Sequence, residues 1–269
     1  MLGKLVKHDF LSTWKVPVAL DAVLIFLGIL TAFAVQGIHS VGDSVGMSIF
    51  MFSFVGVFYI GIIAANIITL IYLVVRYYRN LYTSEGYLTF TLPVKTDMIV
   101  HSKVITGSVW MFLSYLFTVV SLLIAGAGFI KATHVTPAEL KESFTQINAV
   151  MGLTDPGFIA IMIFVFLITP ISGILCMYFS VSIGQLWQNH KVLGSVLCIV
   201  ALYIINQFIS QIAFIGSGFW QMMGSPDVDA IFGRIYRNMM LIISIITALE
   251  GVAYYIVCLV INRKCVNLD

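Results

Sequence analysis

The chain has 269 residues, of which 60% are hydrophobic and only 10% are charged. Soluble proteins carry about 25% charged residues, so this composition excludes a water-soluble globular protein. The formal net charge of +2 is too small to favour nucleic acid as a partner. The four cysteines are too few for a secreted disulfide scaffold, and we interpret them as packing residues.

Six apolar stretches are long enough to cross a membrane as helices. A helix needs roughly 20 mostly apolar residues to cross the ~30 Å hydrocarbon core, where lipid cannot satisfy bare backbone groups. None of the stretches alternates polar and apolar residues as a lipid-facing β-strand would. The sequence therefore predicts an all-α integral membrane protein, a single six-span transmembrane domain over residues 1–269. The six predicted transmembrane helices are residues 16–36, 47–75, 104–130, 158–183, 192–215 and 239–261.

The positive charges predict the orientation of these spans. Segments near spans on the cytoplasmic side are enriched in Lys and Arg, and an even number of spans places both termini on one side. Only four of the 14 Lys and Arg residues fall on the other side. These four are Lys131, Lys141, Arg234 and Arg237. We therefore expect a multi-pass protein of the cell membrane with both termini in the cytoplasm. The first apolar run is longer than a typical signal core, so we expect it to be retained.

The first segment, residues 1–15, has the spacing of an amphipathic helix. Its apolar residues share one face, whereas Lys4, His8 and Lys15 fall on the opposite side. The pattern predicts an interfacial helix in the headgroup plane, although a simple cluster of orienting charges explains it equally well. The apolar face comprises Leu2, Leu5, Val6, Phe10 and Trp14.

The connection at 76–103 is too apolar for a solvated cytoplasmic linker. We expect short helices separated by a turn, because Gly86 and Pro93 interrupt the segment and Thr96 with Asp97 suits a helix start. Aromatic and leucine residues flanked by Arg and Lys have the composition of a docking surface. A re-entrant or interfacial loop is the alternative.

Two outer connections, 131–157 and 216–238, are each predicted to contain a short helix. Thr136, Pro137 and Glu139 form a helix start with a capping box, and Gly152 would end that helix. Residues Ser225 to Asp229 indicate the second helix, before the sixth span. Gating of a substrate and sealing of the surface are both compatible with these helices.

Five polar side chains inside the spans could line a substrate pathway. Glu250 lies near the middle of the last span, where an acidic residue needs a partner. It could bind a cationic or amphiphilic substrate, carry a proton, or serve only as a structural hydrogen-bonding group. Interhelical amide bonds could equally explain the amide residues, and we expect Asp21 to pair with nearby cytoplasmic basic residues. The five candidates are Asn66, Asn206, Gln207, Gln211 and Glu250.

No motif for covalent chemistry or metal binding is present. The chain lacks a phosphate-binding G-x-x-x-x-G-K-[ST] loop, an H-E-x-x-H motif and a G-x-S-x-G motif. Its five histidines are scattered across loops and helix ends. We therefore predict no catalytic residue, no metal site and no cofactor in this chain, and expect it not to be an enzyme.

The segment after the second span resembles a known pattern. It reads EGYLTFTLPVKTDMIVHSK, in which an acidic residue and glycine precede spaced leucines, Pro-Val and a lysine that opens the next span. This order is similar to that of permease subunits of ABC-2 type ABC exporters. IGQLWQNHKVLG at 183–194 and MLGKLVKHDF at 1–10 are similar to segments of their Gram-positive bacterial members. Tyr87 departs from the pattern, because threonine is commoner there.

The resemblance implies a permease that pairs with a second half, identical or related, and with a separate cytoplasmic ATPase that would bind ATP and Mg²⁺. The coupling helix would lie in the loop between spans two and three and transmit closure of the ATPase to the spans. A self-contained secondary transporter with Glu250 as its proton site is an alternative, and a non-transporting assembly or sensor protein is another. The implied coupling residues are Tyr78, Leu81, Tyr82, Glu85, Gly86, Leu88, Leu92 and Pro93.

Overall fold

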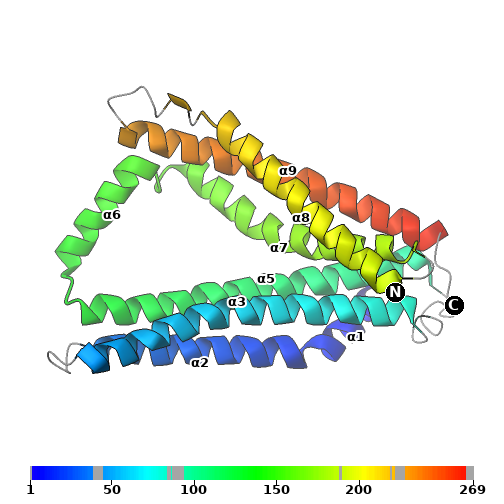
Figure 1. Cartoon of the computed structure of the whole chain (residues 1–269), viewed down its shortest axis with the longest axis horizontal. Helices are drawn as coiled ribbons and strands as arrows, with labels where there is room; N and C mark the ends of the chain where they lie inside the picture. The colour runs from blue at the N-terminus through cyan, green and yellow to red at the C-terminus, as the bar shows by residue number, and fades with distance from the viewer. Residues whose placement is uncertain are drawn as a thin grey trace. The chain divides into compact units, whose positions relative to one another are not determined.

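A computed structural model describes residues 2–38, 45–83, 86, 94–187, 190–218, 220–221 and 228–264. Within these ranges the chain is all-helical: they contain eight α-helices and no strand. The helices are labelled in Figure 1. They are α1 (Leu2–Thr13), α2 (Lys15–Ile38), α3 (Val45–Tyr82), α5 (Thr96–Ala132), α6 (Pro137–Met151), α7 (Pro156–Gly184), α8 (Lys191–Gly216) and α9 (Val228–Lys264).

Six of the described helices are long and apolar enough to cross a membrane, which confirms the predicted number and the multi-pass character. Each predicted span lies largely within one of them, but three of the helices are much longer than the apolar stretches that predicted them. The candidate spans are Lys15–Gly37, Phe52–Tyr82, Thr96–Ala132, Pro156–Gly184, Lys191–Gly216 and Ile231–Arg263.

The chain forms two compact units. Unit 1 consists of Met1–Arg76 and Ile105–Leu140, and unit 2 consists of Tyr77–Val104 and Lys141–Asp269. The chain passes from unit 1 to unit 2 within α3, after Arg76, and returns to unit 1 within α5, after Val104. Both α3 and α5 therefore contribute residues to both units.

Small residues allow close helix packing in unit 1. An added Cβ at Gly28 would lie 2.9 Å from the Ser121 carbonyl oxygen, and one at Gly128 would lie 2.4 Å from Ala32 Cα. The axes of α2 and α5 can therefore approach closely, as at membrane helix interfaces that rely on small residues. Thr31 completes the contact from α2 to α3, because its hydroxyl lies 3.4 Å from the Phe54 carbonyl oxygen.

Within unit 1, the last turns of the N-terminal helix α1 pack against α5. The indole N–H of Trp110 on α5 donates to Thr13 Oγ1 at 3.0 Å, and the Trp110 ring stacks on Phe10 at 4.5 Å between centroids. Arg76 donates to the hydroxyl of Ser12. A helix is confirmed at Leu2–Thr13, and its interfacial position stays a prediction. Its inward side includes buried Asp9 and Thr13, whereas Trp14, predicted for the apolar face, is 44% exposed.

Unit 2 is organised around α7, which packs against both α8 and α9 (Figure 1). Small residues again lie at the contacts: Ser172 on α7 donates its hydroxyl to the Thr247 carbonyl oxygen of α9 at 2.9 Å. At the other end of α7, the helix packs closely against α8: an added Cβ at Gly184 would lie 2.0 Å from Ser195 Oγ.

The predicted capping box and the helix that follows it are confirmed by α6. Thr136 N–H donates to Glu139 Oε2 at 2.9 Å, and Glu139 N–H donates to Thr136 Oγ1 at 3.3 Å. These hydrogen bonds lower the pKa of Glu139 below its usual value, so the carboxylate that forms the cap persists at neutral pH. The helix ends at Met151 because Gly152 adopts a φ of 67°.

Two predicted loop boundaries are wrong. Residues 76–82 continue α3 and residues 96–103 belong to α5, so the connection between these helices is confined to 83–95. The predicted short helix in 216–238 is likewise wrong for residues 228–238, because they form the first turns of the long helix α9. Residues in each of these three segments contact other helices of the protein. These contacts stabilise α3, α5 and α9 beyond the apolar stretches that predicted them.

We predict that Gly128→Ala destabilises the α2–α5 contact, because the new Cβ would overlap Ala32. Overpacking of this kind costs about 1–3 kcal/mol. The measurement is the free energy of unfolding in detergent micelles, followed by circular dichroism. Gly126→Ala on the same helix is the matched control, because an added Cβ there has nothing within 4 Å. Equal effects of the two substitutions would contradict the proposed close contact.

Candidate functional site

Four polar side chains at one end of unit 2 form a closed network, which we call the hydroxyl cluster: Tyr77, Tyr82, Ser182 and Asn262. Tyr82 Oη lies 2.9 Å from Ser182 Oγ and 2.8 Å from Asn262 Oδ1. Tyr77 Oη lies 3.1 Å from Ser182 Oγ and accepts from Asn262 Nδ2 at 3.2 Å. Every member thus contacts two others, and the cluster joins α3, α7 and α9.

Burial makes the hydroxyl cluster rigid. Tyr77, Ser182 and Asn262 are each at most 3% exposed, and the Tyr77 ring stacks on Tyr178 of α7 at 4.0 Å between centroids. A buried polar group without a partner is costly, so the four side chains stabilise one another only in this arrangement. The last turn of α3 is therefore fixed to the ends of α7 and α9.

A second set of contacts joins the start of α5 to α9. Arg263 donates from Nε and Nη2 to the two carboxylate oxygens of Asp97, at 2.6 and 2.5 Å. One turn along, the Tyr255 hydroxyl bonds the ring of His101. Asp97 also lies in the first turn of α5, where a negative charge is favoured by the helix dipole. Both helix ends that flank the 83–95 connection are thus attached to α9.

The predicted coupling residues divide into three groups. Leu81 is fully buried and Tyr82 belongs to the hydroxyl cluster, so both side chains contact other parts of unit 2. Gly86 is buried as well, and its N–H donates to the Thr83 carbonyl oxygen at 2.7 Å. Tyr78 is half-buried. Glu85, Leu88, Leu92 and Pro93 lie outside the described residues.

Glu250 lies in a second polar group within unit 2. Its carboxyl lies within electrostatic range of Tyr254, one turn along α9, and of Cys176 on α7. Tyr254 is 8% exposed and interacts in turn with Asn206 on α8. Asn206 and Glu250 are therefore both neighbours of Tyr254. Sequence reasoning missed Tyr254 and Cys176, although the i, i+4 spacing of Glu250 and Tyr254 was a usable signal.

The other three pathway candidates do not join this group. Gln207 and Gln211 are exposed on α8, and Asn66 belongs to unit 1. Asn66 Nδ2 donates to Thr118 Oγ1 at 3.1 Å and to the Ile62 carbonyl oxygen at 2.9 Å. These contacts favour the structural interpretation of Asn66 as an interhelical amide.

Asp21 has a different partner from the one predicted. It is 2% exposed, and its Oδ2 accepts from the Ser114 hydroxyl at 3.3 Å. Among the described residues its other oxygen has no hydrogen-bond partner. The expected pairing with cytoplasmic basic residues is therefore absent from the described part of the chain, and α2 instead presents Asp21 to α5 in the interior of unit 1.

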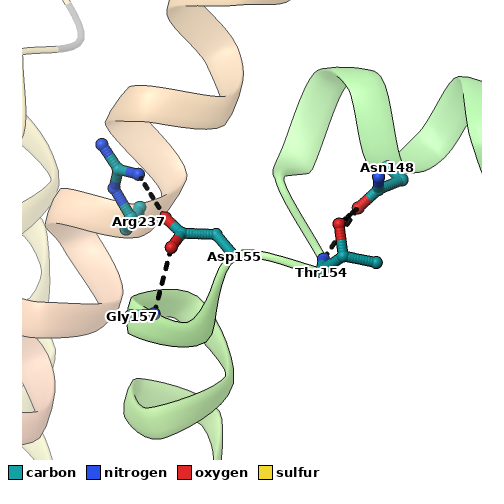
Figure 2. Close-up of polar contacts among 5 residues, drawn as sticks. All are labelled: Asn148, Thr154, Asp155, Gly157 and Arg237. Carbon is teal, nitrogen blue, oxygen red and sulfur yellow. Dashed lines mark hydrogen bonds and ion pairs between the residues drawn. The ribbon is translucent and has the colours of Figure 1, made fainter.

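At the other end of unit 2, a polar contact joins the start of α7 to α9. Asp155 caps α7 by accepting from Gly157 N–H at 3.1 Å, and its second oxygen pairs with Arg237 of α9 at 3.1 Å. Figure 2 shows both contacts, together with Asn148, whose Oδ1 accepts from Thr154 N–H at 2.8 Å. Arg237, counted as a loop charge in the sequence, is therefore a helix-to-helix contact.

No group of three or more His, Cys, Asp and Glu side chains within the described ranges could hold a metal ion. The comparisons with protein families, with curated proteins and with solved structures find no match to this chain.

We predict that Tyr82→Phe destabilises unit 2, because it removes a hydroxyl with two partners in the hydroxyl cluster. Loss of such a buried hydrogen bond costs about 1–2 kcal/mol, measured as a lower midpoint of thermal unfolding in detergent. Tyr78→Phe, four residues earlier on the same helix, is the control and should leave the midpoint nearly unchanged. An equal response of both variants would show that the cluster does not stabilise the helix ends.

Proposed function

We propose that this chain is the membrane-spanning permease subunit of an ATP-driven exporter of the ABC-2 type. It would pair with a second permease half, identical or related, and with a separate cytoplasmic ABC ATPase that supplies ATP and Mg²⁺ chemistry. The substrate class that fits a membrane pathway is amphiphilic: a peptide, drug or lipid. The sequence order of the 85–103 segment is what first supports this proposal.

The observation that carries the proposal is the attachment of both ends of the 83–95 connection to α9. The last turn of α3 is held through the hydroxyl cluster, and the first turn of α5 through Asp97 and Arg263. A partner that displaces this connection must therefore displace the ends of α7 and α9, or break buried hydrogen bonds. Mechanical coupling to an ATPase requires such a stiff joint, because ATP binding can act only by stabilising one of two arrangements.

Leu81 and Tyr82 would then hold the joint to the spans, and partner contact would fall to other residues. Arg79 is exposed and Tyr78 is half-buried, so they are the described residues best suited to the ATPase side. The coupling helix itself would occupy the segment from Glu85 to Pro93. We assign this part by the resemblance of its sequence.

The proposed orientation is a cell-membrane protein with both termini in the cytoplasm. In unit 1, Ser12 at the end of α1 contacts Arg76 of α3, and in unit 2, Asn262 near the end of α9 contacts Tyr82 of α3. We propose that α1 lies at the cytoplasmic membrane surface, with exposed Leu11 and Trp14 in lipid and Lys4 and Lys7 toward headgroups.

We predict that the purified chain, solubilised in mild detergent, captures an ATP-binding subunit that mass spectrometry identifies. Glu85→Lys reverses a charge in the proposed coupling helix and should reduce this capture at least several-fold without lowering thermal stability. Glu142→Lys on the outer helix α6 is the matched control and should leave capture unchanged. If no ATP-binding subunit is captured by the unaltered chain, the exporter proposal is wrong, and a non-transporting assembly or sensor protein becomes the better interpretation.

A self-contained secondary transporter is the second candidate, favoured by the position of Glu250 beside Tyr254 and Cys176 within a candidate span. An ionisable group there is expensive unless it has a partner or meets water, and such groups mark substrate, ion or proton pathways. In an exporter, the same group would line the pathway together with Asn206.

We predict that Glu250→Gln changes transport or its pH dependence while membrane assembly persists, because the amide keeps the shape but cannot ionise. Tyr254→Phe tests whether the neighbouring hydroxyl takes part. Uphill transport by the purified chain without ATPase, lost in Glu250→Gln, would favour the secondary transporter. Unchanged transport in Glu250→Gln would leave Glu250 with a structural role only.

A further inference from the structure

Three side chains in the interior of unit 1 each have a buried oxygen atom with no hydrogen-bond partner among the described residues. They are Asp21 on α2, through Oδ1, and Asn66 and Thr69 on α3, through Oδ1 and Oγ1. We call these three residues the oxygen group. Asp21 is 2% exposed and Thr69 is fully buried. Buried polar groups are nearly always satisfied, so atoms of this kind indicate a bound ion or water.

The oxygen group meets one turn of α5. Asp21 Oδ2 accepts from the Ser114 hydroxyl at 3.3 Å. Asn66 donates from its nitrogen to Thr118, and the Thr118 hydroxyl donates to the Ser114 carbonyl oxygen one turn back. Thr69 lies one turn from Asn66 on the same face of α3. The contacts made by Asn66 Nδ2 and Asp21 Oδ2 thus hold both side chains against α5 and leave their second polar atoms unpaired.

The packing of α2 against α3 places Asp21 at the depth of the other two members. Gly61 of α3 lies against Leu27 of α2, and Phe54, earlier on α3, meets Thr31, later on α2. The two helices are therefore antiparallel. The step back along α2 from Leu27 to Asp21 matches an equal step forward along α3 from Gly61, which ends between the two α3 residues of the oxygen group.

The chemistry of the oxygen group suits a cation. Its unpartnered atoms are a carboxylate, an amide and a hydroxyl oxygen, which are ligands that hard cations prefer. A water molecule could donate to two of them but would not compensate the negative charge, and among the described residues no basic side chain pairs with Asp21. With a single carboxylate, a monovalent cation neutralises the site, whereas a divalent cation would leave a buried positive charge.

We propose that the oxygen group binds a monovalent alkali-metal cation, Na⁺ or K⁺, in the interior of unit 1. Ionisable residues inside membrane-spanning helices mark ion and substrate pathways, and here the carboxylate comes together with two further unpartnered oxygens on a neighbouring helix. The bound cation would join α2 to α3 where α5 already contacts both. The site belongs to a different unit from Glu250, and it does not depend on the proposed exporter function.

Thermal unfolding of the purified full-length chain in detergent tests this site. A ligand that binds only the folded chain raises the midpoint of unfolding. In NaCl or KCl the midpoint should lie about 3 °C or more above that in choline chloride of equal concentration, with a saturable dependence on the cation. The cation that acts at the lower concentration is the one that the site prefers. Equal midpoints in all three salts would overturn the proposal.

Asp21→Asn keeps the shape of the side chain but removes its charge, so it should abolish the difference between the alkali salts and choline chloride. A purely structural carboxyl would change the midpoint equally in all three salts. An alkali-specific shift that survives Asp21→Asn would therefore place the cation elsewhere and overturn the proposal.

Thr69→Val gives a second test that does not alter charge. It should raise the cation concentration needed for half of the shift several-fold, because it removes one oxygen ligand. The matched control is Thr106→Val: Thr106 is 3% exposed and its hydroxyl is also unpartnered, but it lies about 12 Å along α5 from Ser114. Thr106→Val should leave the half-maximal concentration unchanged. Equal responses of the two variants would contradict the assigned ligands.

Discussion

Hydrocarbon cannot form hydrogen bonds, so every polar side chain in a membrane-spanning helix needs a partner within protein. This constraint accounts for the polar contacts of both units. In unit 1, the Asn66 amide meets Thr118 and the Asp21 carboxyl meets Ser114. In unit 2, burial imposes a similar requirement at the end of α3 and joins Tyr82 to Asn262 over a sequence separation of 180 residues. Polar groups thus specify which helices are neighbours, whereas apolar packing alone would allow many arrangements.

The sequence was sufficient for features that depend on local chemistry. Apolar length predicts the six spans because one helix crosses the bilayer by itself. The capping box predicts the start of α6 because Thr136 and Glu139 are three residues apart. The orientation and the coupling segment follow from charge distribution and resemblance, and they remain predictions.

The sequence was insufficient where distant residues decide the outcome. Arg76 to Tyr82 reads as the start of a loop, because its charged residues end the apolar run; yet Tyr77 and Leu81 are buried against other helices, which extends α3. A cluster rich in Tyr and Leu has the same composition whether it faces its own helices or a partner. Likewise, Tyr254 beside Glu250 is foreseeable from spacing, but the approach of Asn206 from α8 is not.

The 38 residues of α3 have a consequence for where a soluble partner can bind. At about 1.5 Å per residue the helix is about 57 Å long, and a tilt of about 20° shortens its vertical reach only to about 54 Å. A bilayer with its headgroups is about 40–45 Å thick. The helix therefore extends roughly 10 Å in total beyond the headgroup layers, so at least one of its ends is within reach of a soluble protein that does not penetrate them.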